Sequence, residues 1–398
     1  MLKKQTNCRL CQSEDMYTFL DLGYHPHSDQ FRRDNDQPET RYPLTVQMCR
    51  GCGLAQLGQV VDAHELYQKD YLYEASITKT ADKHWSDLAD DVITKTGINQ
   101  GVSIDIGGND GTLALKFKER GFEAWNIDPC PEVCAISESR GVNTDNNFWG
   151  DAMMPLADII TGTNVFAHVD DLDKFVLEIQ DTLNPEGVFV FESPYFAEFL
   201  DGLEYDTVYH QHLSYLSLKP LIPFLAKYDL EVFDVKKTPL HGGGFRVFIG
   251  HKGVCPISDN VQKMLDSENW TEEYLMDWGV KCKQHRDVFF DTIYKLYTEG
   301  KTIACVSAPA KGMTLLNYTG IGRFISFITE KSQLKIGRYT PGTKMLIESD
   351  DNLIDRQPDY ALILAWNFAD EIIKNNPEYK GTWIVPLPEI KFVKNESL

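Results

Sequence analysis

Short apolar runs alternate with longer amphipathic stretches along the chain from about residue 82. In chain order, the expected elements are a helix at 82–96, a strand at 102–106, a helix at 113–120, strands at 124–127 and 157–160, a helix at 173–183 and a strand at 188–191. Asn184-Pro-Glu-Gly187 is expected to end the last helix. Strands that alternate with helices in this way predict βαβ units and a parallel, doubly wound sheet of the Rossmann-like type.

A second α/β pattern occupies the last third of the chain. It follows a long helix expected at 271–299, and its strands are expected at 302–306, 324–328 and 360–364. The first residues differ from both blocks, because they have few apolar runs and contain turn-forming clusters such as Arg33-Asp-Asn-Asp-Gln-Pro38. We predict an α/β protein with a small N-terminal module over residues 1–70, a Rossmann-like domain over 71–250 and a second Rossmann-like domain over 251–398.

Composition and charge narrow the class of protein. With 398 residues and 42% hydrophobic side chains, the chain can bury a large core. No apolar run approaches the roughly 18 residues of a membrane span, and Met1 is not followed by an apolar signal region. We therefore expect a cytoplasmic protein without a membrane partner. The net charge of -20 repels nucleic acid polymers, although Lys311, Arg338 and Lys344 can still attract a small anion locally.

Four of the nine cysteines form two CxxC pairs, Cys8-Arg-Leu-Cys11 and Cys49-Arg-Gly-Cys52, which are separated by 37 residues. Each pair can present two thiolates from a tight turn, and four thiolates suit a tetrahedral zinc ion. In a reducing compartment such pairs are more often metal ligands than disulfides. We predict that Cys8, Cys11, Cys49 and Cys52 hold a structural Zn2+ with no open position for catalysis; the alternative is that the cysteines are unrelated.

A glycine-rich turn, Ile104-Asp-Ile-Gly-Gly-Asn-Asp-Gly-Thr112, follows the first expected strand. A nucleotide cofactor at the carboxyl edge of a parallel sheet needs a first turn without bulky side chains, and the three glycines meet this need. The turn lacks the GxGxxG pattern of a pyrophosphate site. It also places Asp105 and Asp110 beside the ligand, where a cationic sulfonium is better tolerated than a phosphate. The turn therefore favours S-adenosylmethionine (SAM) over NAD.

Asp128 ends the second strand of this unit, about 20 residues after the turn, and is placed to accept hydrogen bonds from both ribose hydroxyls. The alternative interpretation is a structural glycine turn with a capping aspartate. Asn164 and His168 follow a later strand, where methyltransferases position reacting groups, but a helix cap or a satisfied core group is an equal alternative. The predicted cofactor-binding residues are Asp105, Gly107, Asn109, Asp110, Gly111, Asp128, Asn164 and His168.

Further motifs span nearly the whole chain. Besides the CxxC pairs and the glycine turn, they are Asn164-Val-Phe-Ala-His-Val-Asp-Asp171, Tyr209-His-Gln-His-Leu-Ser-Tyr215, His241-Gly-Gly-Gly244, Ser307-Ala-Pro-Ala-Lys-Gly312, Gly337-Arg-Tyr-Thr-Pro-Gly-Thr343 and Ala365-Trp-Asn-Phe368. Together they resemble the sugar C-methyltransferases of deoxysugar biosynthesis. The resemblance implies a zinc-binding domain, a SAM domain and a C-terminal Rossmann-like domain. It also implies that a nucleotide-diphosphate 4-keto-deoxysugar is methylated next to its ketone through an enolate.

The resemblance implies roles for the segment around His212. This histidine would be the base or part of a proton relay, and an imidazole suits that task at neutral pH. Tyr209 and either Tyr71 or Tyr73 would hydrogen-bond the sugar. The family usually has Glu immediately before the histidine, whereas this chain has Gln211, which cannot take a proton. Without the resemblance, His212 would be interpreted as a packed histidine with local hydrogen bonds.

The resemblance also implies that the C-terminal domain binds the sugar nucleotide. The candidate substrate-binding residues are His241, Lys311, Arg338, Thr343 and Asn367. Lys311 would place a cation at a sheet edge, as a pyrophosphate requires. Structural turns would have similar sequences, and the neighbouring tryptophan is equally suited to a core position.

Three functions remain open from the sequence. The first is C-methylation of a nucleotide keto-sugar by a monomer or weak homodimer. The second is SAM-dependent O- or N-methylation of another small metabolite. The third is a non-catalytic nucleotide-sugar binding protein that has lost the carboxylate at position 211.

Overall fold

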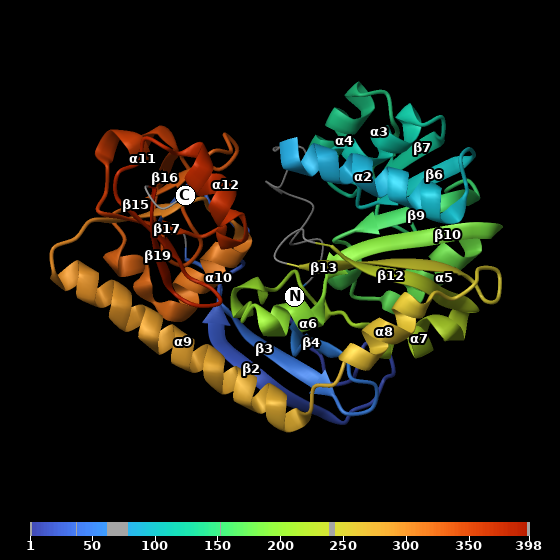
Figure 1. Ribbon diagram of the computed structural model, residues 1–398, viewed down its shortest axis with the longest axis horizontal. Helices are drawn as coiled ribbons and strands as arrows, with labels where there is room; N and C mark the ends of the chain where they lie inside the picture. The colour runs from blue at the N-terminus through green and yellow to red at the C-terminus, as the bar shows by residue number, and fades with distance from the viewer. Residues whose placement is uncertain (1, 37, 62–78, 152, 239–242, 396–398) are drawn as a thin grey trace.

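The computed structural model describes residues 2–36, 38–61, 79–151, 153–238 and 243–395 (Figure 1). The seven-stranded sheet lies on the right of Figure 1, the six-stranded sheet on the left, and the N-terminal sheet below and between them. The α/β class and the Rossmann-like core expected from the sequence are confirmed.

The seven-stranded sheet forms the larger α/β unit. Its spatial order is β12 (Leu230–Thr238), β13 (Gly244–His251), β10 (Leu183–Pro194), β9 (Ala157–Thr163), β6 (Val102–Ile106), β7 (Glu123–Ile127) and β8 (Asn143–Asp145). The five strands from β10 to β8 are parallel, whereas β13 is antiparallel to both β10 and β12. The strand order reverses between β6 and β9. In open α/β sheets a ligand binds at such a switch point, beside the carboxyl ends of the strands.

Seven helices belong to this unit among the described residues. They are α2 (Lys79–Thr96), α3 (Thr112–Glu119), α4 (Pro131–Ser139), α5 (Leu172–Thr182), α6 (Phe196–Asp201), α7 (Leu218–Leu225) and α8 (Asp259–Ser267). Helix α2 is amphipathic, and its buried Trp85, Leu88, Ala89 and Val92 recur at helical spacing. The same spacing explains why the sequence predicted this helix.

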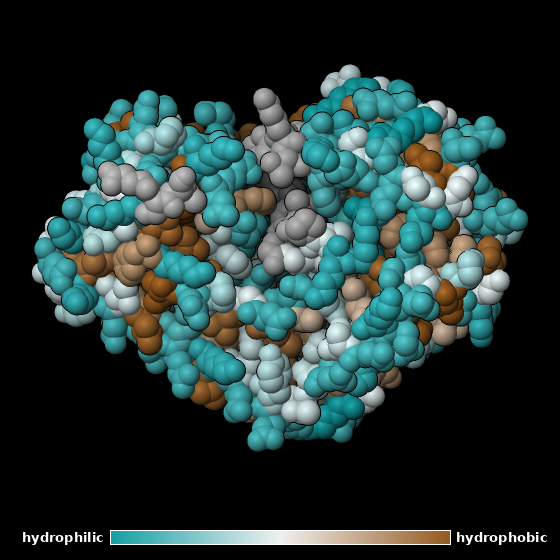
Figure 2. Space-filling model, in the orientation of Figure 1, coloured by the Kyte–Doolittle hydropathy of each residue, from teal (hydrophilic) through white to brown (hydrophobic). Residues whose placement is uncertain are grey.

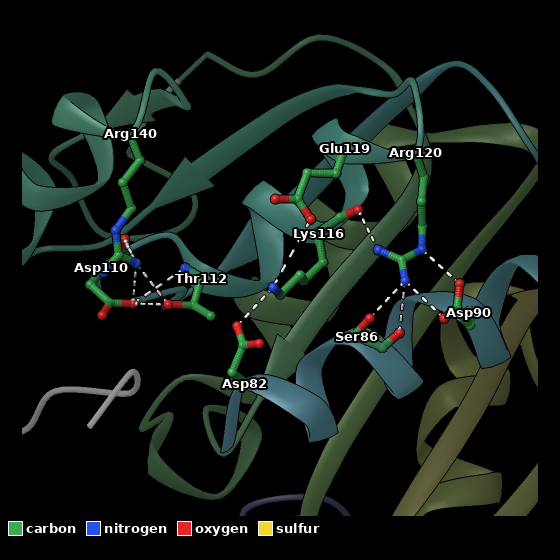
Figure 3. Close-up of polar contacts among 9 residues, drawn as sticks. All are labelled: Asp82, Ser86, Asp90, Asp110, Thr112, Lys116, Glu119, Arg120 and Arg140. Carbon is green, nitrogen blue, oxygen red and sulfur yellow. Dashed lines mark hydrogen bonds and ion pairs between the residues drawn. The ribbon is translucent and has the colours of Figure 1, made fainter. Parts of the chain in front are cut away.

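Polar side chains join α2 to the helix that follows the glycine turn. The Arg120 guanidinium donates to Asp90, with Nε and Oδ1 2.7 Å apart, and also to the Ser86 hydroxyl at 2.9 Å (Figure 3). Lys116 lies 2.7 Å from Asp82 at the start of α2. These contacts hold α2 against α3.

Helix α5 and strand β10 meet without the expected turn. Asp171 caps α5 by accepting a hydrogen bond from the Lys174 backbone N–H at 3.0 Å, and the helix ends at Thr182. Strand β10 begins at the next residue, and its pairing register with β9 shifts between Leu183 and Val188. Residues 184–187, expected to be a turn outside the strand, are therefore an irregularity within β10.

The N-terminal sheet borrows a strand from the middle of the chain. Its order is β11 (Ser214–Tyr215), β4 (Ala55–Leu57), β3 (Tyr42–Cys49) and β2 (Met16–His25), and a separate ribbon pairs β1 (Lys3–Lys4) with β5 (Gln59–Val60). Ser214 pairs with Gln56 and Tyr215 with Ala55. Because β11 follows the 209–212 segment directly, this pairing fixes that segment against the N-terminal module.

The six-stranded sheet forms the second α/β unit. Its order is β16 (Ile347–Ser349), β15 (Phe327–Glu330), β14 (Ile303–Val306), β17 (Tyr360–Ile363), β18 (Thr382–Val385) and β19 (Lys391–Lys394), with helices α10 (Ala310–Thr319), α11 (Asp351–Arg356) and α12 (Ala369–Asn375). Strand β15 starts later than the expected residue 324, because a 3-10 turn over Ile321–Phe324 precedes it.

The long helix α9 (Glu272–Thr298) runs along the N-terminal and C-terminal sheets, as Figure 1 shows. Its expected bounds, 271–299, agree with the structure to one residue, and Thr271 caps it by accepting from the Tyr274 N–H at 3.2 Å. A Cβ at Gly279 would clash with the Phe19 carbonyl on β2, so glycine permits this close crossing.

The visible surface is mostly hydrophilic, with hydrophobic side chains scattered over it (Figure 2). Within the described ranges, we find no helix with both the length and the apolar character needed to cross a bilayer.

Candidate active site

The cysteines of the two CxxC pairs converge on one point. The four sulfur atoms lie within 4.8 Å of one another. The Cys8 and Cys52 sulfurs are 3.4 Å apart, and the Cys11 and Cys49 sulfurs are 3.5 Å apart. Tetrahedral Zn–S bonds of about 2.3 Å separate sulfur atoms by about 3.8 Å. The spacing and the all-sulfur donor set therefore fit a closed structural zinc site.

The glycine turn connects β6 to α3 at the switch point of the large sheet. A Cβ at residue 108 would clash with Asn126 Oδ1 and Asp105 Oδ2. Gly111 has a φ of 73°, and a Cβ there would clash with Ser137. These two glycines are thus required by the protein's own packing. The glycines were expected to serve the approach of a ligand, whereas these two make room for side chains of the protein itself.

Two acids with altered pKa values lie beneath the turn. Burial, opposed by the hydrogen bond from Thr161 and reinforced by the charges of Asp128 and Asp110, raises the pKa of Asp105 to about 7. Burial also raises the pKa of Asp128, although two backbone N–H groups oppose this effect. A cationic ligand nearby would favour the ionised form of both acids, which fits a sulfonium cofactor.

Asp128 is held at the end of β7. Its Oδ2 accepts from the Asn109 N–H at 3.1 Å, and its Oδ1 accepts from the Cys130 N–H at 2.9 Å. Each carboxylate oxygen has a second lone pair. The fixed carboxylate can therefore still accept ribose hydroxyls.

Asp110 lies between Thr112 and Arg140, as Figure 3 shows. Its Oδ1 accepts from the Thr112 hydroxyl at 2.6 Å and lies 3.3 Å from Arg140 Nη1. This acid therefore accepts from Thr112, the first residue of α3, and is paired with an arginine. The expected contact between Asp110 and the cofactor stays a prediction.

Asn164 and His168 follow β9 at the same edge of the sheet. Asn164 has a φ of 56°, and its N–H donates to the Glu192 carbonyl at 2.8 Å. Burial lowers the pKa of His168 to about 4, so this imidazole is neutral at pH 7. Its ring packs edge-on against the His212 ring with centroids 5.0 Å apart. The structure thus brings two predicted site histidines together.

The Tyr209 hydroxyl and His212 form a hydrogen-bonded pair. His212 Nδ1 lies 2.8 Å from the Thr207 carbonyl oxygen, and His212 Nε2 lies 2.7 Å from the Tyr209 hydroxyl. A carbonyl can only accept, so Nδ1 carries the proton of the neutral ring. Nε2 is consequently unprotonated and accepts from Tyr209. His212 also borders a small crevice whose walls include Tyr195, Phe199 and Tyr215.

Known proteins match the chain from end to end. Residues 8–67 match a zinc-binding domain family, residues 80–235 a methyltransferase domain family, and residues 239–388 the family of C-methyltransferase C-terminal domains. The C-methyltransferase NovU of Streptomyces niveus is 30% identical over 409 aligned positions, which cover 98% of this chain and 97% of that protein. The chain belongs to the C-methyltransferase family. This C-methyltransferase is SAM-dependent and has an N-terminal zinc-binding domain.

Solved structures resemble parts of the C-methyltransferase. A SAM-dependent methyltransferase from Clostridium acetobutylicum is 15% identical with a TM-score of 0.37, over 43% of this chain and 92% of that one. The magnesium protoporphyrin IX methyltransferase of Synechocystis is 8% identical with a TM-score of 0.37, over 46% of this chain and 90% of that one.

The predicted substrate-binding residues in the C-terminal part of the C-methyltransferase do not share one environment. Lys311 Nζ stands 3.9 Å above the Trp366 ring, and Asp206 Oδ2 accepts from the indole N–H at 2.7 Å. Burial lowers the pKa of Lys311, while the charges of Asp206 and Glu204 oppose this effect. The lysine therefore already faces two carboxyl groups and an indole ring.

The remaining candidates of the C-methyltransferase make local contacts or lie outside the described residues. Arg338 is buried and donates to the Phe31 carbonyl at 3.1 Å. The hydroxyls of Thr343 and Thr340 are 2.7 Å apart, and Asn367 is half-buried. The predicted residues Tyr71, Tyr73 and His241 fall in the ranges that the structure does not describe.

The sequence did not lead us to predict a buried ionic network that lies beside the candidate site of the C-methyltransferase. Glu192 on β10 lies 2.7 Å from His84 Nε2 and 2.6 Å from Arg246 Nη2, and Arg246 also contacts Asp91. Although burial acts to raise it, the hydrogen bond with His84 and the positive charge of Arg246 hold the pKa of Glu192 below its usual value. The signal available in the sequence was a lone arginine within the apolar run Gly244-Phe-Arg-Val-Phe-Ile249.

Proposed function

We propose that this C-methyltransferase methylates a carbon next to the ketone of a nucleotide-linked 4-keto-deoxysugar, in deoxysugar biosynthesis. The family supplies the reaction type, and the motifs quoted above support the sugar as the acceptor. The observation that carries the proposal is the Tyr209–His212 pair, because it offers a base and a hydroxyl donor side by side.

In the proposed step, a carbon–hydrogen bond next to the ketone breaks. For this step the Tyr209 hydroxyl donates to the ketone oxygen instead of to His212, which frees the single lone pair of Nε2. The proton then passes to His212 Nε2, the electron pair forms the carbon–carbon double bond of the enolate, and the ketone oxygen becomes negatively charged. The resulting imidazolium keeps its Nδ1–H bond to the Thr207 carbonyl, which supports the ring in place.

SAM, when bound, supplies an electrophilic methyl group. We assign its binding to the residues at the carboxyl edge of the large sheet: Asp105, Gly107, Asn109, Asp110, Gly111, Asp128, Asn164 and His168. In this assignment Asp128 orients the ribose, and the neutral His168 lies beside the base without repelling its positive form.

We assign the sugar nucleotide to the C-terminal part of a three-domain chain divided at 1–70, 71–250 and 251–398. The assigned residues are His241, Lys311, Arg338, Thr343 and Asn367, together with Tyr71 or Tyr73 for the sugar. Since Asp206 and Glu204 lie near Lys311, its charge would serve to hold this edge as well as the substrate.

Hydrogen exchange without SAM tests the proposal. The zinc-loaded protein is incubated in D2O with a nucleoside-diphosphate 4-keto-6-deoxyglucose, and deuterium in the sugar is measured by NMR. We expect deuterium at one carbon next to the ketone, and a 14-dalton gain at that carbon once SAM is added. A His212→Asn variant should lose the exchange, whereas a His251→Asn variant should retain it.

Other outcomes identify the alternatives. Methyl gain on oxygen or nitrogen without deuterium exchange would indicate an O- or N-methyltransferase. Binding of the sugar nucleotide with neither exchange nor methylation would indicate a non-catalytic binding protein. Either result would reject the proposed enolate chemistry.

A further inference from the structure

Only the NH2 end of the Gln211 amide has a hydrogen-bond partner among the described residues. The side chain is 2% exposed and belongs to the segment that carries Tyr209 and His212. Its Nε2 donates to Asp29 Oδ2 at 3.2 Å. Its Oε1 is buried and hydrogen-bonds to no atom within the described part of the chain. Buried acceptors without a donor are rare in folded proteins, so this oxygen calls for a ligand.

Two polar residues adjacent in sequence to Asp29 and Gln211 do not supply the missing donor. The Ser28 hydroxyl is paired with the Thr314 hydroxyl at 3.2 Å. His210 Nε2 lies 3.3 Å from the Pro43 carbonyl, which can only accept, so the proton of the neutral ring is on Nε2. His210 Nδ1 then has no proton to donate to Gln211.

Asp29 determines which end of the amide faces it. An ionised carboxylate has no proton to donate, so the amide must present its NH2 group to Asp29 and its oxygen to the other side. The flipped amide would place two acceptor oxygens within hydrogen-bond distance. Burial raises the pKa of Asp29, and the positive charge of Lys335 opposes this effect.

We propose that Gln211 Oε1 accepts a hydrogen bond from a ring hydroxyl of the sugar substrate, and that Asp29 is the positioning residue that holds the amide for this contact. The inference rests on the proposed function, since it takes a sugar bound at Tyr209 and His212 as its starting point. It gives Gln211 a role in substrate selection that needs no proton transfer. It also makes the N-terminal module part of the substrate site, through Asp29.

Substrates that lack single hydroxyls test the contact. The full-length, zinc-loaded protein is assayed with a nucleoside-diphosphate 4-keto-6-deoxyglucose and with its 2-deoxy and 3-deoxy analogues. In the wild type, loss of the recognised hydroxyl should lower kcat/KM about tenfold or more, because the buried oxygen loses its donor. In Gln211→Leu, loss of the same hydroxyl should change kcat/KM by less than about twofold. Equal effects in both proteins would overturn the proposal.

Charge transposition tests the role of Asp29. In Asp29→Asn the new amide can donate to Gln211 Oε1, so sensitivity to the hydroxyl should fall. In the double variant Asp29→Asn/Gln211→Glu, the carboxylate at 211 accepts from the new amide and keeps an acceptor for the sugar, so sensitivity should return. A purely structural role for Asp29 does not predict this rescue. A double variant that is no more sensitive than Asp29→Asn would overturn the positioning role.

A matched surface pair provides the control. Gln262 Nε2 donates to Asp266 at 2.7 Å on the exposed side of α8, and Gln262→Leu should leave hydroxyl discrimination unchanged. Calorimetric binding of the same sugars without SAM separates the two hypotheses. Methylation without Gln211-dependent discrimination rejects only this inference. If binding depends on the hydroxyl through Gln211 but no methylation occurs, the Gln211 inference is supported and the proposed function is rejected. Neither binding nor methylation rejects both.

Discussion

Arg246 Nη2 lies 2.6 Å from Glu192 Oε1 between two strands of the large sheet, and both residues are only 3% exposed. His84 Nε2 reaches the other oxygen of Glu192 at 2.7 Å. The backbone carbonyl of Glu192 also accepts from Asn164. The ionic network therefore connects α2, β10 and β13 directly to the carboxyl edge of the sheet.

Removal of Arg246 should destabilise the protein strongly. Arg246→Met leaves the Glu192 carboxylate buried without its main cation, which costs about 3–5 kcal/mol in comparable buried pairs. The free energy of unfolding, measured by urea titration with fluorescence, should fall by about this amount. Glu192→Met/Arg246→Met should restore much of the loss, because no unpaired charge remains. Lys237→Met provides a control: its ion pair with Glu198 is partly exposed to solvent, so the loss should stay below about 1 kcal/mol.

Loss of one sulfur ligand should release the zinc. Cys11 is exposed, so Cys11→Ser changes little packing and should reduce zinc from about one ion per chain to nearly none. Cys255→Ser, outside the cluster, should retain the metal. Mass spectrometry of the metal content measures both.

Zinc loss should also weaken the junction with the methyltransferase domain. Arg9, between Cys8 and Cys11, donates to Asp170 Oδ1 at 2.7 Å from a nearly buried position. Without the metal this arginine loses its fixed place, so the midpoint of thermal unfolding should fall. An unchanged midpoint after complete zinc removal would contradict this structural role.

Local periodicity predicted much of the fold. The strand at 102–106, the helix after it and the long helix α9 were expected within one or two residues, because apolar spacing and caps specify them locally. The antiparallel β13 and the borrowed strand β11 were not expected. Ser214 pairs with Gln56 through the backbone, and no side-chain pattern marks such a long-range pairing.

The sequence likewise identified some parts of the candidate site and not others. The CxxC pairs and the glycine turn carry their chemistry within a few residues, so the sequence identified them. The contact between Gln211 and Asp29 joins residues 182 positions apart, and Arg246 meets Glu192 across a sheet. Neither partner could be chosen before the strands were paired.

His168 should make stability depend on pH. Its pKa is about 4 in the folded protein, because burial disfavours the charged ring, against about 6.5 in the unfolded chain. Between these values the unfolded chain binds the extra proton, so stability is unaffected above about pH 6.5 and falls as the pH drops towards 4. The contribution is about 1–3 kcal/mol.

The variant His168→Asn isolates this contribution. Its free energy of unfolding should fall less steeply than that of the wild type between pH 6.5 and 4, whatever its stability at pH 7. His251→Asn should follow the wild-type slope. Parallel curves for His168→Asn and the wild type would contradict a lowered pKa of His168 in the folded protein.

The tautomer of His212 makes Nε2 its basic nitrogen. In His212→Asn, the new amide can still donate to the Thr207 carbonyl but offers no basic nitrogen, so kcat should fall by about 10²- to 10⁴-fold with little change in unfolding free energy. Tyr209→Phe keeps the ring and loses the donor to the proposed enolate oxygen, so kcat should fall by about 10- to 100-fold. Tyr24→Phe, at a highly exposed tyrosine, should retain full activity. Methyl transfer is followed by product mass with SAM and the keto-sugar nucleotide. If His212→Asn kept more than about a tenth of the wild-type rate, another group would have to be the base, because a positioned base contributes at least about 10²-fold.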